Sequence, residues 1–339
     1  MSMKRWSKEQ VWTWWNSRNW PVGVNYVPTD AVNDIEMWMD VSFNAPLIQK
    51  ELSLAAGLGI NSVRVFLSYT VWYHERERFL NNFEAFLSIA AGNGVSVMPV
   101  LFDDCAFDFG SEPRYGTQME PVPGVHNSRW VPSPGFAVQD DPKETEHCER
   151  YVREVIGTHR EDPRILVWDL YNEPGNTGRF EKALPLLEKA FGWARECEPV
   201  QPLTAGVWHH ANNEAVEEYC AEASDIISLH AYTPFERTCE LLERYQKHDR
   251  PLLITEWMHR PAGNTILTHL PLFHEKKIGV WQWGMLVGKT QTNLSWSTMN
   301  GGKPDQQPVL WQHDLLYADG TPYDQAETDL IAELTGKGK

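Results

Sequence analysis

The 339-residue sequence has few basic residues relative to acidic ones, with 30 lysines and arginines against 46 aspartates and glutamates and a net charge of −16. This balance argues against nucleic acid or an anionic membrane surface as a partner. No apolar run reaches the roughly 18 residues that a membrane-spanning helix needs. The apolar stretch Val11–Trp15 leads directly into polar residues, so we expect no secretory signal and a cytoplasmic location.

Cysteine is scarce and follows no pattern. The five cysteines are an odd number, are widely spaced and include no Cys-x-x-Cys pair, which argues against a disulfide framework and fits a reducing compartment. Internal repeats and low-complexity segments are absent as well. A hydrophobic fraction of 42% and a charged fraction of 22% are typical of a globular protein and exclude a disordered one.

Tryptophan, by contrast, is abundant, with 16 residues. About half of them are expected in the core, because a buried indole removes a large apolar area from water. The others are candidates for flat binding platforms. A sugar ring presents a flat C–H face, which an uncharged aromatic ring covers well, so the composition favours a carbohydrate as substrate.

Eight short apolar or β-branched segments alternate with stretches of helical periodicity. Their hydrophobicity is continuous, as is typical of buried parallel strands. This order predicts a single closed (β/α)8 TIM barrel, since the alternative, a doubly wound open sheet, usually needs a glycine-rich turn where only Gly23 is found. The predicted strands are Val22–Asn25, Ile60–Phe66, Val95–Leu101, Ile165–Leu170, Leu203–Val207, Ile226–His230, Leu252–Glu256 and Gly279–Trp283.

The helical stretches carry end signals. Asp141–His159 begins with Asp141 as a possible cap, Pro142 in the first helical position and Glu144 placed for a capping box. Other predicted helices are Asn44–Ala56, Phe79–Ala91, Phe180–Glu198 and Phe235–His248.

The chain is expected to form one barrel domain. This domain covers residues 21–339 and follows a lead-in segment, residues 1–20, with a helix over Lys8–Asn19. The region 102–140 is rich in proline and glycine, but it is too central to be a linker. We predict a long ordered loop after the third strand, and such loops tend to be functional.

Two glutamates stand at predicted strand ends. In a barrel of this kind the active site lies at the C-terminal ends of the strands, where Glu173 follows the fourth strand and Glu256 ends the seventh. Burial there raises the pKa of a carboxyl group unless a cation or a donor compensates. Hydrolysis of a glycosidic bond needs two carboxyl groups, one to protonate the leaving oxygen and one as nucleophile or base. The pair therefore predicts a glycoside hydrolase.

The residues around both glutamates resemble the clan A glycoside hydrolases, the barrel superfamily that includes the family 5 cellulases and mannanases. Asn172-Glu173-Pro174 is similar to the Asn-Glu-Pro motif of the clan, and Ile254–Trp257 to its nucleophile strand. The similarity spans about residues 20–290, with family 5 as the nearest family. It implies a retaining β-glycosidase with Glu173 as acid/base and Glu256 as nucleophile, which needs no cofactor and no metal.

The resemblance also implies residues that bind the substrate. Arg64 resembles the arginine that ends the second strand, His230 and Tyr232 the His-x-Tyr of the sixth, and Trp283 the tryptophan floor of the eighth. Asn172 is implied as the donor to the sugar 2-hydroxyl.

The remaining candidates come from strand ends. Trp281 precedes Trp283 by two residues on the same side of a strand, so the two are expected to stack in layers. Asp103 and Asp104 stand where many family 5 members have a histidine, and they either bind sugar hydroxyls or cap a turn. Trp208 and Asn25 complete the candidate substrate-binding set.

We expect cleavage near the end of a short substrate. Prolines restrict the predicted 102–140 loop before it folds, and Tyr115, Trp130 and Phe136 are available to pack inward. Such a wall beside the two glutamates would close one end of a pocket. The alternative is that the loop only covers the barrel rim.

Three other functions stay open. An endo-acting cellulase, mannanase or xylanase would use the same residues on a polymer. A non-catalytic carbohydrate-binding barrel would keep the tryptophans and lose one carboxylate. A metal-dependent hydrolase could use His209, His210 and His230, but such barrels usually carry a His-x-His after the first strand, and Val24–Tyr26 has none.

Overall fold

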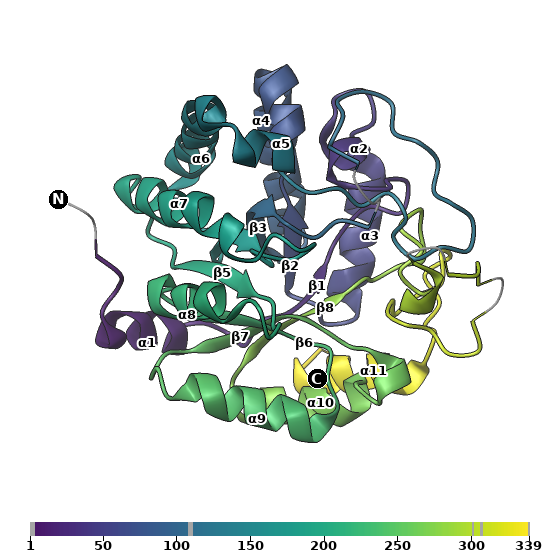
Figure 1. The fold of residues 1–339 in the computed structure, drawn as a ribbon. Coiled ribbons are helices and arrows are strands. Elements are labelled where there is room, and N and C mark those ends of the chain that lie inside the picture. Colours follow the sequence, from purple (N-terminus) through teal and green to yellow (C-terminus); the bar gives the residue numbers. More distant parts are fainter. Residues whose placement is uncertain (1–3, 108–110, 300–301, 306–307, 338–339) are drawn as a thin grey trace.

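The computed structural model of the protein describes residues 4–107, 111–299, 302–305 and 308–337. Its eight strands pair in parallel in chain order, and β8 pairs back onto β1, which closes the barrel (Figure 1). The predicted (β/α)8 fold is therefore confirmed and the open sheet is excluded. The strands are β1 (Val22–Asn25), β2 (Ser62–Phe66), β3 (Ser96–Asp103), β4 (Trp168–Asn172), β5 (Leu203–Val207), β6 (Ile227–Ala231), β7 (Leu252–Trp257) and β8 (Gly279–Trp283).

The fourth strand begins later than predicted. Ile165 forms only an isolated bridge with Val97, and continuous pairing starts at Trp168. A register shift between Asp169 and Asn172 then interrupts the pairing with β5. Asn172 is thus the last residue of β4, and Glu173 follows it at the barrel mouth.

Helices surround the sheet, as expected for alternating strands and helices (Figure 1). They are α1 (Lys8–Asn16), α2 (Asp34–Trp38), α3 (Ala45–Gly57), α4 (Tyr69–Gly92), α5 (Phe136–Asp140), α6 (Thr145–His159), α7 (Leu184–Glu196), α8 (Glu214–Ala223), α9 (Phe235–Gln246), α10 (Ile266–Glu275) and α11 (Gln325–Leu334). Among the described residues, none of these helices combines the length and apolar character that crossing a membrane requires.

Two helix starts differ from prediction. α4 begins at Tyr69, after a Ser68 cap, and is kinked at Glu75. The carboxylate of Asp141 accepts the N–H of Lys143 and begins a short 3-10 turn, so α6 itself starts only at Thr145. Pro142 and Asp141 were therefore correctly assigned to a helical start, but the expected capping box does not form.

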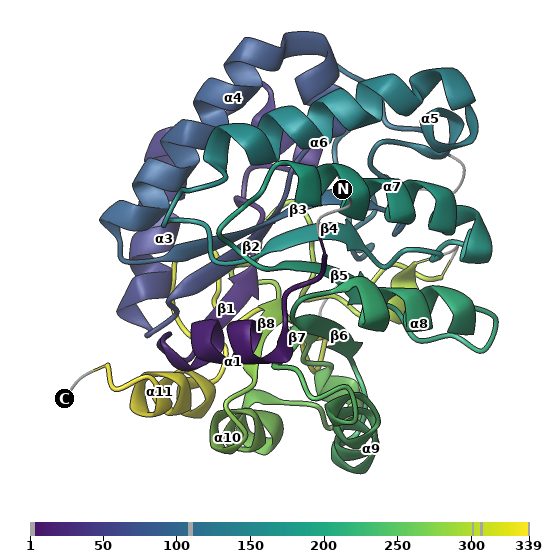
Figure 2. The same ribbon diagram turned by 90° about the vertical axis from the view of Figure 1, so that its left-hand side faces the viewer.

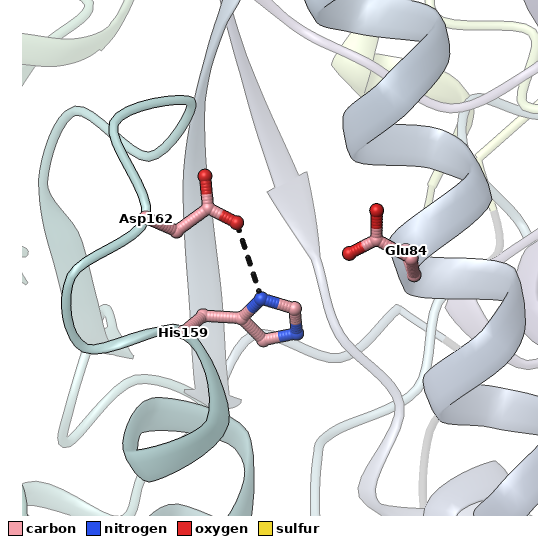
Figure 3. A group of neighbouring side chains, drawn as sticks. All are labelled: Glu84, His159 and Asp162. Atoms are coloured by element: carbon pink, nitrogen blue, oxygen red, sulfur yellow. Dashed lines mark hydrogen bonds and ion pairs between the residues drawn. The ribbon is translucent and has the colours of Figure 1, made fainter.

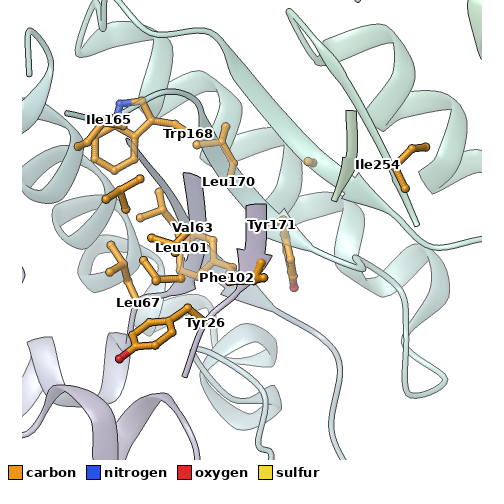
Figure 4. Packing of buried hydrophobic residues seen from close by; sticks show 14 of the residues in the cluster. Tyr26, Val63, Leu67, Leu101, Phe102, Ile165, Trp168, Leu170, Tyr171 and Ile254 are labelled. Carbon is orange, nitrogen blue, oxygen red and sulfur yellow. The ribbon is translucent and has the colours of Figure 1, made fainter. Parts of the chain in front are cut away.

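The core fills the space between strands and helices. Figure 4 shows part of it, in which Val63, Leu101, Phe102 and Trp168 are fully buried. α1 crosses the N-terminal end of the barrel (Figure 2), where its Val11 and Trp15 join a separate apolar cluster.

Two long loops cover the other end of the barrel. The loop after β3 and the loop after β8 lie next to each other at the right of Figure 1, on the side away from α1. The N–H of Asn127 donates to the carbonyl of Thr290 (2.7 Å), and the N–H of His126 donates to Thr298 Oγ1 (2.9 Å). The predicted loop after the third strand is thus present, although its residues 108–110 lie outside the described ones. The loop after β8 is a second covering element, and its place over the barrel mouth was not predicted.

Candidate active site

The two glutamates converge at the barrel mouth. Glu173 follows β4 with a positive φ of 44°, and its N–H donates to the carbonyl of Gly206 (3.0 Å). Glu256 lies in β7, and both side chains are buried. One carboxylate oxygen of each lies within 4.8 Å of the other and of a ring nitrogen of His230.

Glu256 is held by one cation and one hydroxyl. Arg64 Nη1 donates to Glu256 Oε1 (2.9 Å), and the Tyr232 hydroxyl donates to Glu256 Oε2 (2.8 Å). Both contacts favour the ionised carboxylate. Both residues belong to the set that the resemblance implied for the site.

Arg64 is itself fixed from every side. It is fully buried, and Nε donates to Asp169 Oδ2 (2.9 Å), Nη1 to Asn25 Oδ1 (2.7 Å) and Nη2 to Asn172 Oδ1 (2.6 Å). Asp169, also fully buried, balances the guanidinium charge. The sequence analysis missed Asp169, although a charged residue inside an apolar strand is a signal for such a partner.

Glu173 has only neutral contacts. His230 Nδ1 lies 2.6 Å from its Oε1, and the Asn176 amide donates to its Oε2. Burial raises the pKa of Glu173 to about 6, and the Asn176 hydrogen bond opposes this shift. Burial lowers the pKa of His230 to about 3, so the ring is neutral.

The two carboxyl groups differ in the contacts that oppose the rise in pKa caused by burial. Burial raises the pKa of Glu256 too, but Arg64 and Tyr232 act in the opposite direction through direct hydrogen bonds. Among the described residues, Glu173 has no such cation in contact. These contacts favour Glu173 as the site of a proton shared by the pair.

A pocket of about 500 Å³ opens above the pair. The predicted site residues that line it are Asn172, Glu173, Trp208, His230, Tyr232, Glu256 and Trp283. Arg64 and Asn25, expected to bind substrate, do not line the pocket and act instead through Glu256 and Asn172.

The two aspartates after β3 do not line the pocket either. Asp103 accepts hydrogen bonds from Asn172 Nδ2 (2.7 Å) and Trp130 Nε1 (2.8 Å). Asp104 is fully buried and accepts from the Tyr171 hydroxyl (2.7 Å) and the N–H of Gly175 (2.8 Å). Of the two roles considered for them, these contacts favour the structural one, because both carboxylates are occupied by protein donors.

Trp281 is not a second platform. Two residues of strand place it about 6.6 Å below Trp283, in the layer that packs against α1. There it is fully buried, and its Nε1 donates to Ser62 Oγ (3.1 Å). Gly23 makes room for it, since a Cβ at that position would lie 2.2 Å from the indole. The expectation that Trp281 binds sugar is wrong for this reason.

Trp283 belongs to an aromatic floor. Its ring lies 5.6 Å from that of Phe66 and 5.5 Å from that of Trp130, both nearly perpendicular to it. Trp130 comes from the predicted loop after β3 and packs inward as expected. Tyr115 does not, because it is exposed and stacks on His74, and Phe136 lies against Arg179 instead.

The loops also supply lining residues that the sequence analysis missed. They follow four different strands, β3, β4, β6 and β8, with Arg237 and Leu241 in α9, and no local pattern marks them. They are Cys105, Phe107, His126, Asn176, Thr233, Arg237, Leu241, Met299 and His313.

Within the part of the chain that the structure describes, two groups of side chains have the spacing of a metal site. One is Glu173, His230 and Glu256. There the guanidinium of Arg64 contacts Glu256, so a divalent cation would meet a positive charge.

The other group is Glu84, His159 and Asp162, between α4 and the end of α6 (Figure 3). Arg164 donates to both of its carboxylates, with Nη1 2.7 Å from Glu84 Oε1 and Nη2 2.6 Å from Asp162 Oδ2. This group is an ion-pair cluster, and its charges likewise disfavour a divalent metal.

Solved structures share the fold at low identity. A variant of GH5_18 from Streptomyces cattleya in complex with Manb1-4GlcNAc is 15% identical, with a TM-score of 0.67 over 94% of this chain and 81% of that one. An exo-beta-1,4-mannosidase from Opitutaceae bacterium strain TAV5 is 17% identical, with a TM-score of 0.63 over 94% of this chain and 60% of that one. The endo-beta-1,4-mannanase from Thermotoga petrophila is 14% identical, with a TM-score of 0.59 over 95% of this chain and 77% of that one.

Sequence comparison identifies the family. Among curated proteins, none matches the chain. The family described as glycosyl hydrolases family 2, TIM barrel domain, matches residues 111–292, which are more than half of the chain and include both glutamates. The motifs alone pointed to family 5 within the same clan, and the similar structures include members of that family. The chain therefore belongs to the TIM barrel domain family of the family 2 glycosyl hydrolases, in clan A.

Proposed function

We propose that the protein is a retaining β-glycoside hydrolase with Glu173 as acid/base and Glu256 as nucleophile. The observation that carries the proposal is the buried pair of carboxyl groups with oxygens within 4.8 Å, of which only Glu256 contacts a guanidinium. Retaining enzymes keep their carboxyl groups about 5–5.5 Å apart, whereas inverting enzymes need about 6.5–9.5 Å to admit a water. The short separation supports direct attack by Glu256.

The reaction takes place in two displacements. In the first, a Glu256 oxygen bonds to the anomeric carbon while the bond to the leaving oxygen breaks and that oxygen takes the proton of Glu173. In the second, Glu173 accepts a proton from water, the water oxygen attacks the anomeric carbon, and the ester bond to Glu256 breaks. Both glutamates return to their starting protonation states.

One hydrogen of the Asn172 side-chain amide is available to bind the sugar. Its Oδ1 accepts from Arg64, and one hydrogen of its Nδ2 goes to Asp103. The amide carries two hydrogens, so the second is free for the sugar 2-hydroxyl. Such a contact strengthens in the transition state, and Arg64 and Asp103 thus act as positioning residues for Asn172.

A β-mannoside is the first substrate to test. The similar structures named above include a mannosidase, a mannanase and a protein bound to Manb1-4GlcNAc. The pocket has walls from the loops after β3 and β8, which supports a short substrate held at its end. The alternatives are glucosides, xylosides or galactosides in the same pocket, and endo-acting hydrolysis of a polymer.

The test is a panel of nitrophenyl β-glycosides of mannose, glucose, xylose and galactose. We expect the parent to hydrolyse at least one, Glu256→Ala to show no turnover, and Glu173→Ala to lose about 10²- to 10⁴-fold in kcat/KM on a substrate that needs acid assistance. Azide should rescue Glu173→Ala, because it attacks the glycosyl-enzyme without a general base. The exposed Glu84 offers a matched control, and Glu84→Ala should keep parental activity.

Three results would contradict the proposal. Parental activity in Glu256→Ala would remove its nucleophile. Sugar binding by the parent without any turnover would support the carbohydrate-binding barrel instead. Loss of activity after dialysis against EDTA, restored by a divalent metal, would support metal-dependent hydrolysis.

A further inference from the structure

The order of the strands divides the pocket into two sides. Trp283 lies on β8, next to the strand that carries Glu256, whereas Trp208 follows β5, next to the strand that precedes Glu173. The sugar that becomes bonded to Glu256 therefore lies on the Trp283 side. The leaving group, protonated by Glu173, lies on the Trp208 side.

Six residues line the Trp208 side of the pocket, which we call the outer arm. It is formed by Asn176, Trp208, His209, Thr233, Arg237 and Leu241. Trp208 is half-buried, and its ring stacks on those of His210 (5.0 Å, 12°) and Phe180 (6.3 Å, 24°). Neighbours that stack on the indole hold it in one orientation, as a platform for a flat ligand requires.

His209 adds a polar group whose partner is missing. Its Nδ1 lies 3.2 Å from the buried carboxylate Glu217 Oε2, so the proton of the neutral imidazole belongs on Nδ1 and Nε2 is then an acceptor. Glu217 is held by Arg244 (3.1 Å) and by the N–H of His210 (3.1 Å). The Nε2 of His209 is buried and has no hydrogen-bond partner among the described residues. A buried acceptor without a partner is costly, so a ligand that donates a hydrogen bond there would be favoured.

We propose that the outer arm is a subsite for a leaving-group sugar, with Trp208 stacked on its ring and His209 Nε2 accepting a hydrogen bond from one of its hydroxyls. The inference rests on the proposed glycosidase function and deepens it. It narrows the substrates to disaccharides, oligosaccharides and conjugates in which a sugar forms the leaving group. Glycosides of small apolar alcohols would leave the arm unfilled.

The test compares two substrates that share the transferred sugar. β-1,4-Mannobiose has a sugar leaving group, and β-mannosyl fluoride has none, since fluoride is too small to reach the outer arm. If the nitrophenyl panel selects another sugar, the corresponding disaccharide and fluoride are used. The measured quantity is the ratio of kcat/KM for the disaccharide to kcat/KM for the fluoride.

The inference predicts a selective loss. We expect Trp208→Ala to lower this ratio about tenfold, from lost stacking and burial, and His209→Ala to lower it about fivefold, from one lost hydrogen bond. Glu217→Gln, which loosens His209, should lower it in the same direction. His209→Asn keeps an acceptor and should recover part of the loss. His74→Ala, at an exposed site outside the pocket, is the matched control.

Each contrary outcome has a distinct meaning. An unchanged ratio in both Trp208→Ala and His209→Ala, whether or not overall activity falls, would overturn the subsite. So would a parent that hydrolyses the fluoride but not the disaccharide. A parent that hydrolyses neither substrate and no nitrophenyl glycoside would overturn the proposed function itself, and the subsite with it.

Discussion

At the scale of single residues, charge assigns different roles to two chemically identical side chains. Arg64 contacts Glu256, while Glu173 has hydrogen bonds to the neutral His230 and Asn176 side chains and a pKa raised to about 6 by burial. As a result, we expect a bell-shaped dependence of kcat/KM on pH. Activity should rise with pH as Glu256 ionises and fall as Glu173 loses its proton, near pH 6. A kcat/KM that stays flat from pH 6 to pH 8 would contradict this assignment.

Tyr232 provides a sharper test of the acid limb. Its hydroxyl donates to Glu256 Oε2 (2.8 Å), which stabilises the carboxylate. Tyr232→Phe should raise the pKa of Glu256, move the acid limb to higher pH and lower kcat/KM about tenfold. Tyr115→Phe, on the exposed part of the β3 loop, should leave the profile unchanged. A fall in kcat/KM without any shift of the acid limb would indicate that the hydroxyl does not act on Glu256.

The absence of a side chain at Gly206 leaves space for two residues of the site. A Cβ at this position of β5 would lie 3.0 Å from His230 Nε2 and 3.4 Å from Arg64 Nη2. Gly206→Ala should therefore displace the imidazole from Glu173 and lower kcat about tenfold or more, with a smaller effect on KM. The matched control is Gly192→Ala in α7, where a Cβ meets nothing within 4 Å. Equal kcat in the two variants would show that His230 does not depend on this space.

The sequence predicted the residues that a motif carries and missed those that only the fold brings together. Glu173, Glu256 and Tyr232 stand at strand ends, so the barrel topology places them in one mouth. His313 and Arg237 reach the same pocket from loops and helices far apart in sequence, and no local pattern marks them. Trp281 was wrongly assigned to the sugar-binding site. The alternation of side chains along β8 tells on which side of the strand Trp281 lies, but not how deep in the barrel it lies.

At the scale of elements, α2 carries a carboxyl group that the fold buries at a cost. Burial raises the pKa of Asp34 to about 7, whereas an aspartate in the unfolded chain has a pKa of about 4. Between these values the folded protein holds a proton that the unfolded chain has released, so the free energy of unfolding falls as pH rises. Neutral asparagine avoids this loss.

Asp34→Asn should therefore gain stability over the parent as pH is raised. We expect the difference in unfolding free energy between variant and parent to grow by about 2.5 kcal/mol between pH 5 and pH 8. Chemical denaturation at pH 5, 6, 7 and 8 measures it. Asp329→Asn, on the exposed surface of α11, is the control. A difference that shrinks with rising pH would contradict the sign of the effect.

Helices and strands were predicted well where the hydrophobic pattern of the sequence marks them. They were predicted poorly where contacts between distant segments determine the structure. All eight strands were found because apolar residues predominate in each of them. The boundary of β4 was misplaced because Ile165 is as apolar as a strand residue, although only an isolated bridge forms there. The contact between the loop after β8 and the β3 loop was not predicted, because hydrogen bonds such as that from Asn127 to Thr290 have no signature in either segment.

At the scale of the whole molecule, the two loops over the barrel mouth bear on how the substrate enters. Both contribute to the pocket wall, with Phe107 and His126 from one loop and Trp296 and Met299 from the other. A pocket closed on this side admits a chain end and not the middle of a polymer. On a soluble β-mannan we therefore expect one short product from the first minutes of reaction. A random spread of product lengths, seen by chromatography, would show internal cleavage.

The stereochemistry of the first product tests the central claim most directly. Two displacements at the anomeric carbon, through a covalent bond to Glu256, return the β configuration, whereas a single attack by water inverts it. Proton NMR of the reaction can follow the anomeric signal of the released sugar before mutarotation mixes the two forms. We predict that the β anomer appears first. If the α anomer appears first, Glu256 is not a nucleophile and the short separation of the two carboxyl groups has been misinterpreted.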